Sequence, residues 1–396
     1  MRIADVSFTG VAVPILAPRL HADGVTRQVV RTLIEVRTDD GLVGLGEVGV
    51  RVAASRLEAA RRKLLGEDPF ATERLRLMLC KGKFPDREAN ILFAGVEMAC
   101  LDIQGKVAGR PVCDLLGGRV RDSVPTIAYV FRLQEAGDHA GVRTPDEVVA
   151  HTRALVEQHG FRAIKFKAGS ASWREDVETT EALASAFPAH DLRVDPNAIW
   201  SLETALRVAG RLRHLDLEFL EDPVLGLEAM AEVTRRGGIP TATNMCLTDF
   251  HELPRAAALH AVDVVLLDLY YLGGLVSAKS FAQACDAWKI GLGIHSGGAG
   301  TSELGVATAA MLHLASSLPY LVHAADSMYH HQLDDILKGG MLRYHDGAMR
   351  APEGPGLGVE LDPDKVGIFA EAYARWQETQ RRSSPSFDQT PVYPAW

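Results

Sequence analysis

The sequence is poor in cysteine and contains no long uncharged apolar run. Its five cysteines include no C-x-x-C pair, so we expect reduced, buried thiols rather than a disulfide framework or a thiolate metal site. No stretch of 18 uncharged apolar residues could span a membrane, and the N-terminus lacks the apolar core of a signal peptide. These absences predict a cytoplasmic protein that does not bind membranes.

Basic residues are in the minority. The 396-residue chain carries 42 Lys and Arg against 51 Asp and Glu, a formal net charge of −9. Because affinity for phosphates depends on clustered cations, this balance argues against a nucleic-acid partner. Hydrophobic residues make up 47% and charged residues 23%, which excludes collagen-like, mucin-like and long disordered chains.

The N-terminal third predicts a small α+β domain. Residues 31–37 are rich in β-branched side chains, residues 39–41 (Asp-Asp-Gly) form a turn signal, and residues 42–47 supply the return strand. Residues 52–118 have helical spacing punctuated by glycine and proline. A hairpin followed by helices is typical of an α+β unit.

From about residue 125 the pattern changes to strands that alternate with helices. The predicted strands are residues 126–130, 163–167, 192–195, 218–221, 241–244, 264–268, 291–295 and 320–323. After the first pair, the strand ends recur every 23 to 28 residues, which favours a β/α barrel over an open doubly wound sheet.

We therefore expect an α/β protein with three parts. They are a capping domain (1–124), a barrel (125–350) and a C-terminal segment (351–396), whose helix near 364–380 packs back on the capping domain.

Polar residues stand at the ends of the predicted strands. They are Lys165, Lys167, Asp195, Glu221, Asn244, Asp268 and His295. Any one of them has a structural explanation, as a turn residue, a helix cap or a hydrogen-bonded core histidine. Together they predict one convergent site, because the C-terminal strand ends of a barrel build its active site and unpaired buried charges are costly.

Asp195, Glu221 and Asn244 come from three successive strands and offer two carboxylates and one amide oxygen. Such hard oxygen ligands suit Mg²⁺, which keeps water or substrate oxygens at its remaining positions. The alternative is an ion-pair network between these carboxylates and the lysines.

Two further groups predict acid–base chemistry. Lys165 and Lys167 alternate on one strand, so both amines share a face, and like charges at close range lower the pKa of a lysine toward the range of a general base. Asp268 and His295 end successive strands, and a carboxylate behind an imidazole sets its tautomer. A base on each flank of a metal fits removal of the proton α to a carboxylate through an enediolate.

This set of residues resembles the mandelate racemase-like branch of the enolase superfamily. Three stretches are similar to its glucarate dehydratase-like subgroup: residues 193–197 (Arg-Val-Asp-Pro-Asn), 221–223 (Glu-Asp-Pro) and 241–245 (Thr-Ala-Thr-Asn-Met). Residues 129–131 (Tyr-Val-Phe) and 356–360 (Gly-Leu-Gly-Val-Glu) also match. The resemblance implies a capping domain over a modified (β/α)₇β barrel, bound Mg²⁺, and dehydration of acid sugars.

The resemblance also implies roles for single residues. Lys167 and His295 would be opposing bases, and Lys165, Asn197 and Ser296 would assist them. Substrate contacts would come from His21, Thr26, Tyr129 and Phe131, with the loop around residues 21–26 closing over the barrel mouth.

Four positions depart from the subgroup. His21 and Thr26 stand where it has an Asn/His pair, Ala94 where it has Thr, and Met328 where it has His. Because lost polar contacts change specificity strongly, we expect a shorter or less hydroxylated acid sugar than glucarate. The alternatives are a racemase, epimerase or cycloisomerase that uses the same enediolate, and a catalytically silent barrel scaffold. For either enzyme we expect a small carboxylate substrate and a homo-oligomer.

Overall fold

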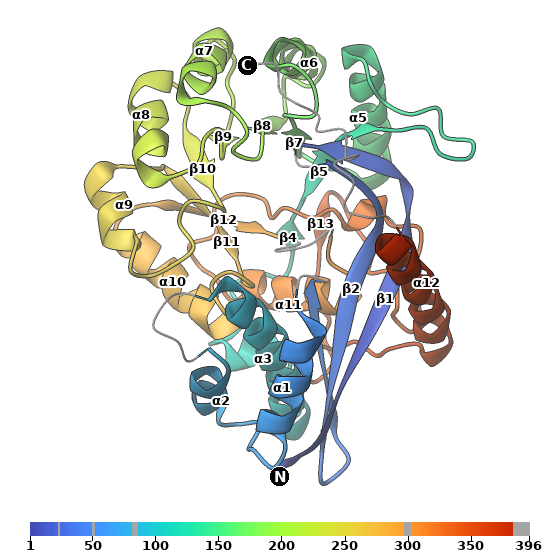
Figure 1. Cartoon of the computed structure of the whole chain (residues 1–396). Coiled ribbons are helices and arrows are strands. Elements are labelled where there is room, and N and C mark those ends of the chain that lie inside the picture. The colour runs from blue at the N-terminus through green and yellow to red at the C-terminus, as the bar shows by residue number, and fades with distance from the viewer. Residues whose placement is uncertain (23, 50–51, 81–85, 297–301, 383–396) are drawn as a thin grey trace.

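The computed structural model describes residues 1–22, 24–49, 52–80, 86–296 and 302–382. Two large sheets and one two-stranded sheet organise this part of the chain (Figure 1). The first is antiparallel, in the order β3-β2-β1-β6, and consists of β1 (Ile3–His21), β2 (Gly24–Thr38), β3 (Val43–Gly49) and β6 (Arg132–Leu133). The predicted turn at residues 39–41 connects β2 to β3.

Helices cover this sheet on one side. They are α1 (Ala54–Leu64), α2 (Thr72–Leu79), α3 (Arg87–Ala108) and the short α4 (Val112–Leu115). Asp86 caps α3 by accepting the N–H of Ala89, and Gly109 ends it at a φ of 65°. Because Gly44 and Gly46 of β3 lack side chains, α3 lies directly on the strand; a Cβ at either glycine would overlap the helix backbone.

The second sheet is parallel and forms the barrel. Its strands, in the order β12-β11-β10-β9-β8-β7-β5, are β5 (Ile127–Val130), β7 (Ala163–Lys167), β8 (Asp191–Asp195), β9 (Phe219–Glu221), β10 (Thr241–Thr243), β11 (Val264–Asp268) and β12 (Gly291–His295). Figure 1 shows the helices arranged as an outer arc around these strands: α5 (Pro145–His159), α6 (Trp173–Ala186), α7 (Leu202–Leu212), α8 (Leu227–Gly237), α9 (Leu253–Leu259), α10 (Leu275–Ala287) and α11 (Gly305–Ser316).

A small apolar cluster lies on the inner face of the barrel strands. Phe219, Ala242, Val264 and Leu266 pack together, separate from the main core. Side chains two residues apart share a face, so this cluster lies on the same face as Glu221, Asn244 and Asp268. It therefore forms an apolar floor beneath the polar strand ends.

The predicted eighth strand at residues 320–323 is wrong. The segment begins in a turn and closes the barrel through isolated backbone hydrogen bonds. Val322 N and His323 N both donate to Leu292 O at 3.2 Å. Ala325 N donates to Pro125 O at 2.8 Å, and Asp326 N donates to Ile294 O at 2.9 Å. These bonds reach alternately to the two neighbouring segments, so no regular ladder forms. The predicted class, an α+β capping domain with a modified α/β barrel, is confirmed.

The last described helix returns to the first sheet. The short strand β13 (Ala348–Met349) pairs with β4 (Val124–Pro125). Helix α12 (Pro363–Arg382) then packs against β1, where a Cβ at Gly10 would overlap the ring of Tyr373. This contact places the last described helix of the chain on its first strand (Figure 1).

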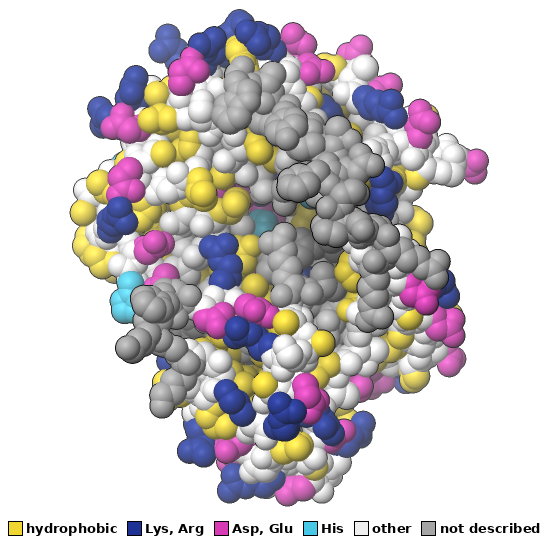
Figure 2. Space-filling model, viewed as in Figure 1, with side chains coloured by type: hydrophobic (Ala, Val, Ile, Leu, Met, Phe, Trp, Pro, Cys, Tyr) yellow, Lys and Arg dark blue, Asp and Glu magenta, His cyan; other side chains and the backbone are white. Residues whose placement is uncertain are grey.

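The distribution of surface charge and the state of the cysteines are those of an ordinary globular protein. Acidic and basic side chains are intermingled over the face shown in Figure 2. All five cysteines are free; four are buried, but Cys80 is partly exposed. In the described residues, no helix is long and apolar enough to cross a membrane.

Five histidines gather between α5 and the short 3₁₀ helix η1 (Tyr329–His331). The ring centroids of neighbouring members lie 4.5–6.4 Å apart, in the order His139, His151, His331, His330 and His159. Both His330 and His331 contact the backbone carbonyl of Tyr129 on β5, at 3.3 and 2.7 Å. Burial lowers the pKa of His151 to about 4 and that of His330 to about 3.

We expect His151→Gln to weaken the acid sensitivity of the fold. A histidine with a lowered pKa in the folded state binds its proton more readily when unfolded, so stability falls as the pH drops from about 6.5 to about 4. Removing this group should reduce that slope by up to about 1.4 kcal/mol per pH unit. Denaturant unfolding across this pH range measures the slope of stability against pH. Carboxyl groups that titrate in the same range contribute equally to the unchanged protein and to the variant, so their effect cancels in the comparison. The exposed His214→Gln serves as control, and an unchanged slope in His151→Gln would contradict the prediction.

Candidate active site

Lys165 and Lys167 lie side by side on β7 and are both buried. Lys165 Nζ contacts Asp326 Oδ2 at 2.6 Å, Glu221 Oε1 at 2.7 Å and Asp195 Oδ2 at 3.3 Å. Lys167 Nζ donates to Asp195 Oδ2 at 2.6 Å and to Asn197 Oδ1 at 2.8 Å. The structure thus joins both lysines to Asp195 at the end of β8, and Lys165 also to Glu221 at the end of β9 and to Asp326 after the last barrel segment.

The expectation that the two lysines lower each other's pKa is wrong for this structure. Burial opposes their charge, but Asp326 and Glu221 raise the pKa of Lys165 well above its ordinary value, and Asp195 raises that of Lys167. For Lys167, the attraction of Asp195 outweighs the repulsion of Lys165, and Lys165 is surrounded by three carboxylates.

The pKa values of Asp195 and Glu221 are shifted in opposite directions. Burial opposes ionisation of Asp195, but Lys167 and Lys165 outweigh it and hold the pKa well below the usual range. Burial raises the pKa of Glu221 well above its usual range, and the nearby carboxylates of Asp195 and Asp326 add to the shift. Glu221 Oε2 lies 2.6 Å from Lys165 Nζ, yet among the described residues it receives no hydrogen bond.

Asn244 follows β10 directly. Its backbone N–H donates to Asp222 Oδ2 at 3.0 Å, and Thr243 Oγ1 donates to the other oxygen of that carboxylate. Asp222 itself has a φ of 36°, and burial raises its pKa to about 6. Asp222 therefore ties the end of β10 to the end of β9, next to Glu221.

Asp195, Glu221 and Asn244 form the donor set predicted for a metal. Strands β8, β9 and β10 are neighbours in the sheet, so the three residues lie at adjacent strand ends. Within the residues that the structure describes, no group of three His, Cys, Asp or Glu side chains could hold a metal ion. The predicted metal site includes an amide oxygen besides the two carboxylates.

The backbone after β8 is unusual. Asn197 and Ala198 have φ angles of 58° and 59°, in the left-handed region that disfavours alanine. Asn197 N donates to Asp195 Oδ1 at 2.8 Å, and Ala198 N donates to Asp222 O at 2.6 Å. These bonds hold the turn that brings the Asn197 side chain to Lys167.

Asp268 and His295 form a pair at neighbouring strand ends. Strands β11 and β12 place them in register, and Asp268 Oδ2 lies 3.2 Å from His295 Nδ1. An ionised carboxylate can only accept, so Nδ1 carries the proton of this contact. Among the described residues, no hydrogen bond or ion pair joins this pair to Lys167.

Ser296 follows His295 and donates to the buried Glu303, at 3.0 Å. Glu303 also accepts from Ser327 Oγ at 2.8 Å. Burial lowers the pKa of Arg19 to about 10, although Glu303 and Tyr129 partly oppose this shift. Glu303 thus binds the serines that follow β12 and precede η1, while Arg19 lies beside Phe131 after β5.

Tyr129 and Phe131 lie on the β5 side. Their rings stack at a centroid distance of 4.8 Å, Lys165 Nζ lies 4.8 Å from the Tyr129 ring centroid, and the guanidinium of Arg19 lies over Phe131 at 5.2 Å. Tyr129 Oη donates to Asp195 Oδ2 at 3.4 Å. Both predicted substrate contacts therefore border the lysine–carboxylate cluster.

His21 and Thr26 belong to the tip of the β1–β2 hairpin rather than to a long loop. His21 Nε2 and Thr26 Oγ1 share a hydrogen bond of 2.9 Å. β1 pairs with β6 just before the tip, and a Cβ at Gly169, two residues past Lys167, would meet Ala22 at 3.2 Å. The hairpin tip is therefore already in contact with the barrel near the end of β7.

Sequence reasoning missed two residues that complete this cluster. Asp326 holds Lys165, and Arg193 donates to Asp326 Oδ1 at 3.1 Å and pairs with Glu218 at 2.5 Å. Arg193 precedes Asp195 by two residues, so strand alternation could have placed it inside the barrel. Asp326 was missed because the predicted eighth segment ended three residues too early.

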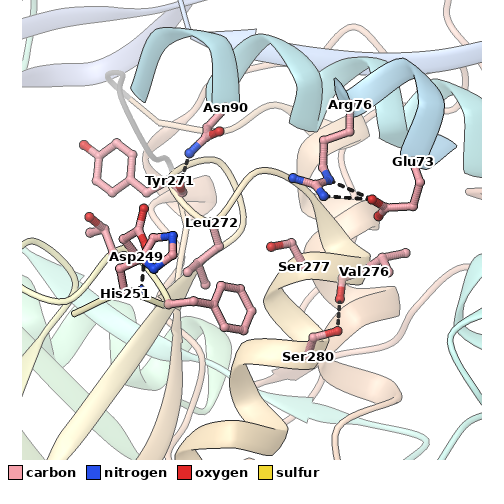
Figure 3. Close-up of a pocket in the computed structure, with 12 residues that line it drawn as sticks. Glu73, Arg76, Asn90, Asp249, His251, Tyr271, Leu272, Val276, Ser277 and Ser280 are labelled. Carbon is pink, nitrogen blue, oxygen red and sulfur yellow. Dashed lines mark hydrogen bonds and ion pairs between the residues drawn. The ribbon is translucent and has the colours of Figure 1, made fainter. Parts of the chain in front are cut away.

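A separate cavity of about 350 Å³ lies between the capping helices and the barrel loops (Figure 3). Its lining includes Glu73, Arg76, Asn90, Asp249, His251 and Tyr271. It contains none of the residues predicted from the sequence to act in catalysis or metal binding.

An α/β barrel with buried lysines and carboxylates at its strand ends, and a separate α+β domain packed beside its mouth, defines a class of capped barrel enzymes. Residues 4–117 match the mandelate racemase/muconate lactonizing enzyme N-terminal domain, and residues 147–365 match the family described as enolase C-terminal domain-like. The chain belongs to the enolase superfamily, in its mandelate racemase-like branch.

Similar proteins cover nearly the whole chain. A probable glucarate dehydratase of Streptomyces coelicolor is 38% identical over 94% of this chain and 92% of its own length. An enolase of Mycobacterium smegmatis in complex with tartrate is 38% identical, with a TM-score of 0.90, over 99% of this chain and 98% of its own. An enolase of Thermobispora bispora in complex with magnesium and formate is 39% identical, with a TM-score of 0.90, over 99% and 100%. Other relatives are named as a chloromuconate cycloisomerase and an N-succinyl-L-Arg/Lys racemase.

Proposed function

We propose that this protein is a Mg²⁺-dependent dehydratase of an acid sugar. The observation that carries the proposal is the buried cluster of Lys165, Lys167, Asp195 and Glu221 at one side of the barrel, with the Asp268–His295 pair at another. The relative named as a glucarate dehydratase, and the similar structures that contain tartrate or magnesium with formate, support the same substrate class.

The donor chemistry fits Mg²⁺ held by Asp195, Glu221 and Asn244. Glu221 is the strongest indication, because its Oε2 is buried and receives no hydrogen bond from any described residue, although Lys165 Nζ lies 2.6 Å away. When bound, the ion would supply positive charge that favours an enediolate. It would compete with Lys165 and Lys167 for the same carboxylate oxygens.

The proton transfers of the proposed reaction are carried out by side chains of the protein. In the proposal, Lys167 or His295 removes the proton on the carbon next to the substrate carboxylate, according to the configuration of that carbon. Because Asp195 raises the pKa of Lys167, this lysine acts as a base only after its ammonium group has lost a proton. His295, protonated on both ring nitrogens either by that α-proton or beforehand when Lys167 is the base, then gives a proton to the neighbouring hydroxyl, which leaves as water. The resulting enol takes up a proton at the next carbon and becomes a 2-keto-3-deoxy acid. Asp268 orients His295, while Lys165, Asn197 and Ser296 assist.

The second candidate is a racemase, epimerase or cycloisomerase. Bases at two sides of the site would allow a proton to return from the opposite face, and the relatives named as a racemase and a cycloisomerase favour this chemistry. Removal of the α-proton is common to both candidates, so they differ only in the fate of the enediolate.

Purified protein with Mg²⁺, incubated with a library of sugar acids, should separate the candidates. Dehydration gives a keto acid that semicarbazide detects, whereas epimerisation changes optical rotation without a keto product. A signal from neither assay, together with no metal binding by calorimetry, would favour a silent scaffold and contradict the proposal.

In the same library we expect D-glucarate to be a poor substrate. His21 and Thr26 bond each other, and Ala94 and Met328 offer no polar group to a sugar hydroxyl. Each lost hydrogen bond to a buried hydroxyl costs about 1–3 kcal/mol, or roughly one to two decades of kcat/KM. A shorter or less hydroxylated acid should be preferred, and a kcat/KM for D-glucarate above about 10⁴ M⁻¹s⁻¹ would contradict this preference.

A further inference from the structure

The backbone of the loop after β11 binds the Asp268 carboxylate next to His295. Asp268 Oδ1 accepts the backbone N–H groups of Tyr270 and Tyr271, at 2.9 and 3.1 Å, while Oδ2 faces His295 Nδ1. The direction of the carboxylate therefore depends on where these two N–H groups lie.

Both tyrosines are held by the capping domain. Arg31 on β2 donates from Nη2 to Tyr270 Oη at 2.7 Å, and its guanidinium lies 5.1 Å from the centroid of the Tyr270 ring. Asn90 on α3 donates to the backbone carbonyl of Tyr271 at 3.0 Å, as Figure 3 shows. The guanidinium of Arg87, also on α3, lies over the Tyr271 ring at 4.3 Å.

The end of the same loop is held in the same way. Glu97, two turns after Asn90 on α3, accepts the N–H groups of Leu275 and Val276 at the start of α10. Gly274 permits this approach, because a Cβ there would overlap the Glu97 carboxylate. One face of α3 thus contacts the loop at both ends.

Arg31 also reaches the segment after β12. It forms a fully buried ion pair with Glu47, at 2.8 Å, and Glu47 accepts the N–H groups of Leu304 at 2.8 Å and Ala307 at 3.0 Å. The two strands that carry Asp268 and His295 are therefore followed by segments that bind one ion pair of the capping domain.

We propose that Arg31 and Asn90 are positioning residues, which clamp the Tyr270–Tyr271 loop so that Asp268 stays aligned with His295. The capping domain then sets the geometry of the acid–base pair as well as covering the barrel. A shift of β2 or α3 relative to the barrel would move the two N–H groups and turn the carboxylate away from the imidazole. The catalytic consequence rests on the proposed role of His295, but the alignment does not.

Tyr270→Phe tests the clamp, because it removes only the hydroxyl that Arg31 binds. In protein labelled with ¹⁵N-histidine, we expect the downfield proton resonance of His295 Nδ1–H to move upfield or to broaden by exchange with water. With a turned-over acid sugar, kcat should fall about 10-fold, KM should stay the same, and the pH profile should change as it does in Asp268→Asn. Adding Tyr270→Phe to Asp268→Asn should cause no further loss.

Asn90→Ala is the second variant, should the buried tyrosine prove necessary for folding, and it should shift the same resonance. Arg74→Ala is the matched control, since Arg74 is an exposed capping-domain arginine paired with Glu67. An unchanged His295 resonance in both Tyr270→Phe and Asn90→Ala would overturn the clamp. The resonance needs no substrate, so this result would not depend on the proposed dehydration, whose failure would appear only in the product assays.

Discussion

Glu221→Gln should abolish turnover and most of the Mg²⁺ affinity. Loss of a partner that only orients a ligand already costs about 10–100-fold in metal affinity, so loss of a direct ligand should exceed about 100-fold. Glu221 lies fully buried at the end of β9, and no other described carboxylate ends this strand. Calorimetric titration with MgCl₂ measures the first effect, and steady-state assays with the acid sugar measure the second.

Glu218→Gln is the matched control. Glu218 is a carboxylate on the same stretch of chain that pairs with Arg193 and His323 rather than with the lysines. This variant should lose stability but keep its affinity for Mg²⁺. Unchanged metal binding in Glu221→Gln would remove the proposed metal site, whatever happened to activity.

Lys167→Ala and His295→Asn should each lower kcat by about 10²–10⁴-fold, the usual contribution of a positioned acid or base. For a substrate of one configuration, one of the two residues abstracts the α-proton and the other completes the reaction. Exchange of that proton with D₂O, followed by NMR, should therefore survive in one variant and be lost in the other. With a substrate of the opposite configuration, the variant that keeps the D₂O exchange and the variant that loses it should be reversed.

Two exposed residues serve as controls for this pair. Lys289 and His214 lie at the surface, and neither contacts a described residue of the proposed site. Lys289→Ala and His214→Asn should keep full activity. If Lys167→Ala and His295→Asn also kept steady-state turnover, the proposed mechanism would be wrong.

The placement of the polar residues in the site follows largely from the local sequence pattern of the strands. Parallel strands bring their C-terminal ends to one edge, and strand order in the barrel follows chain order. The types and spacing of Asp195, Glu221, Asn244, Asp268 and His295 are therefore enough to predict adjacent polar strand ends. The sheet order and the contact between Asp268 and His295 confirm that arrangement, while the catalytic and metal-binding roles stay predictions.

Other features depend on pairs that no local pattern connects. Lys165 meets Asp326 across 161 positions, and this contact reverses the expected direction of its pKa shift. The segment before Asp326 closes the barrel without a regular ladder, so its end could not be read from strand periodicity. Arg31 meets Tyr270 across 239 positions and joins two domains.

The amino-acid sequence by itself determined the class of fold, the superfamily and the set of groups at the strand ends, because each depends on periodicity and residue type along neighbouring positions. Only the tertiary structure decided how those groups are charged and how the capping domain holds them. The reason is physical: a pKa and an alignment depend on the charges and donors within a few ångströms, and in a folded chain these come from distant segments.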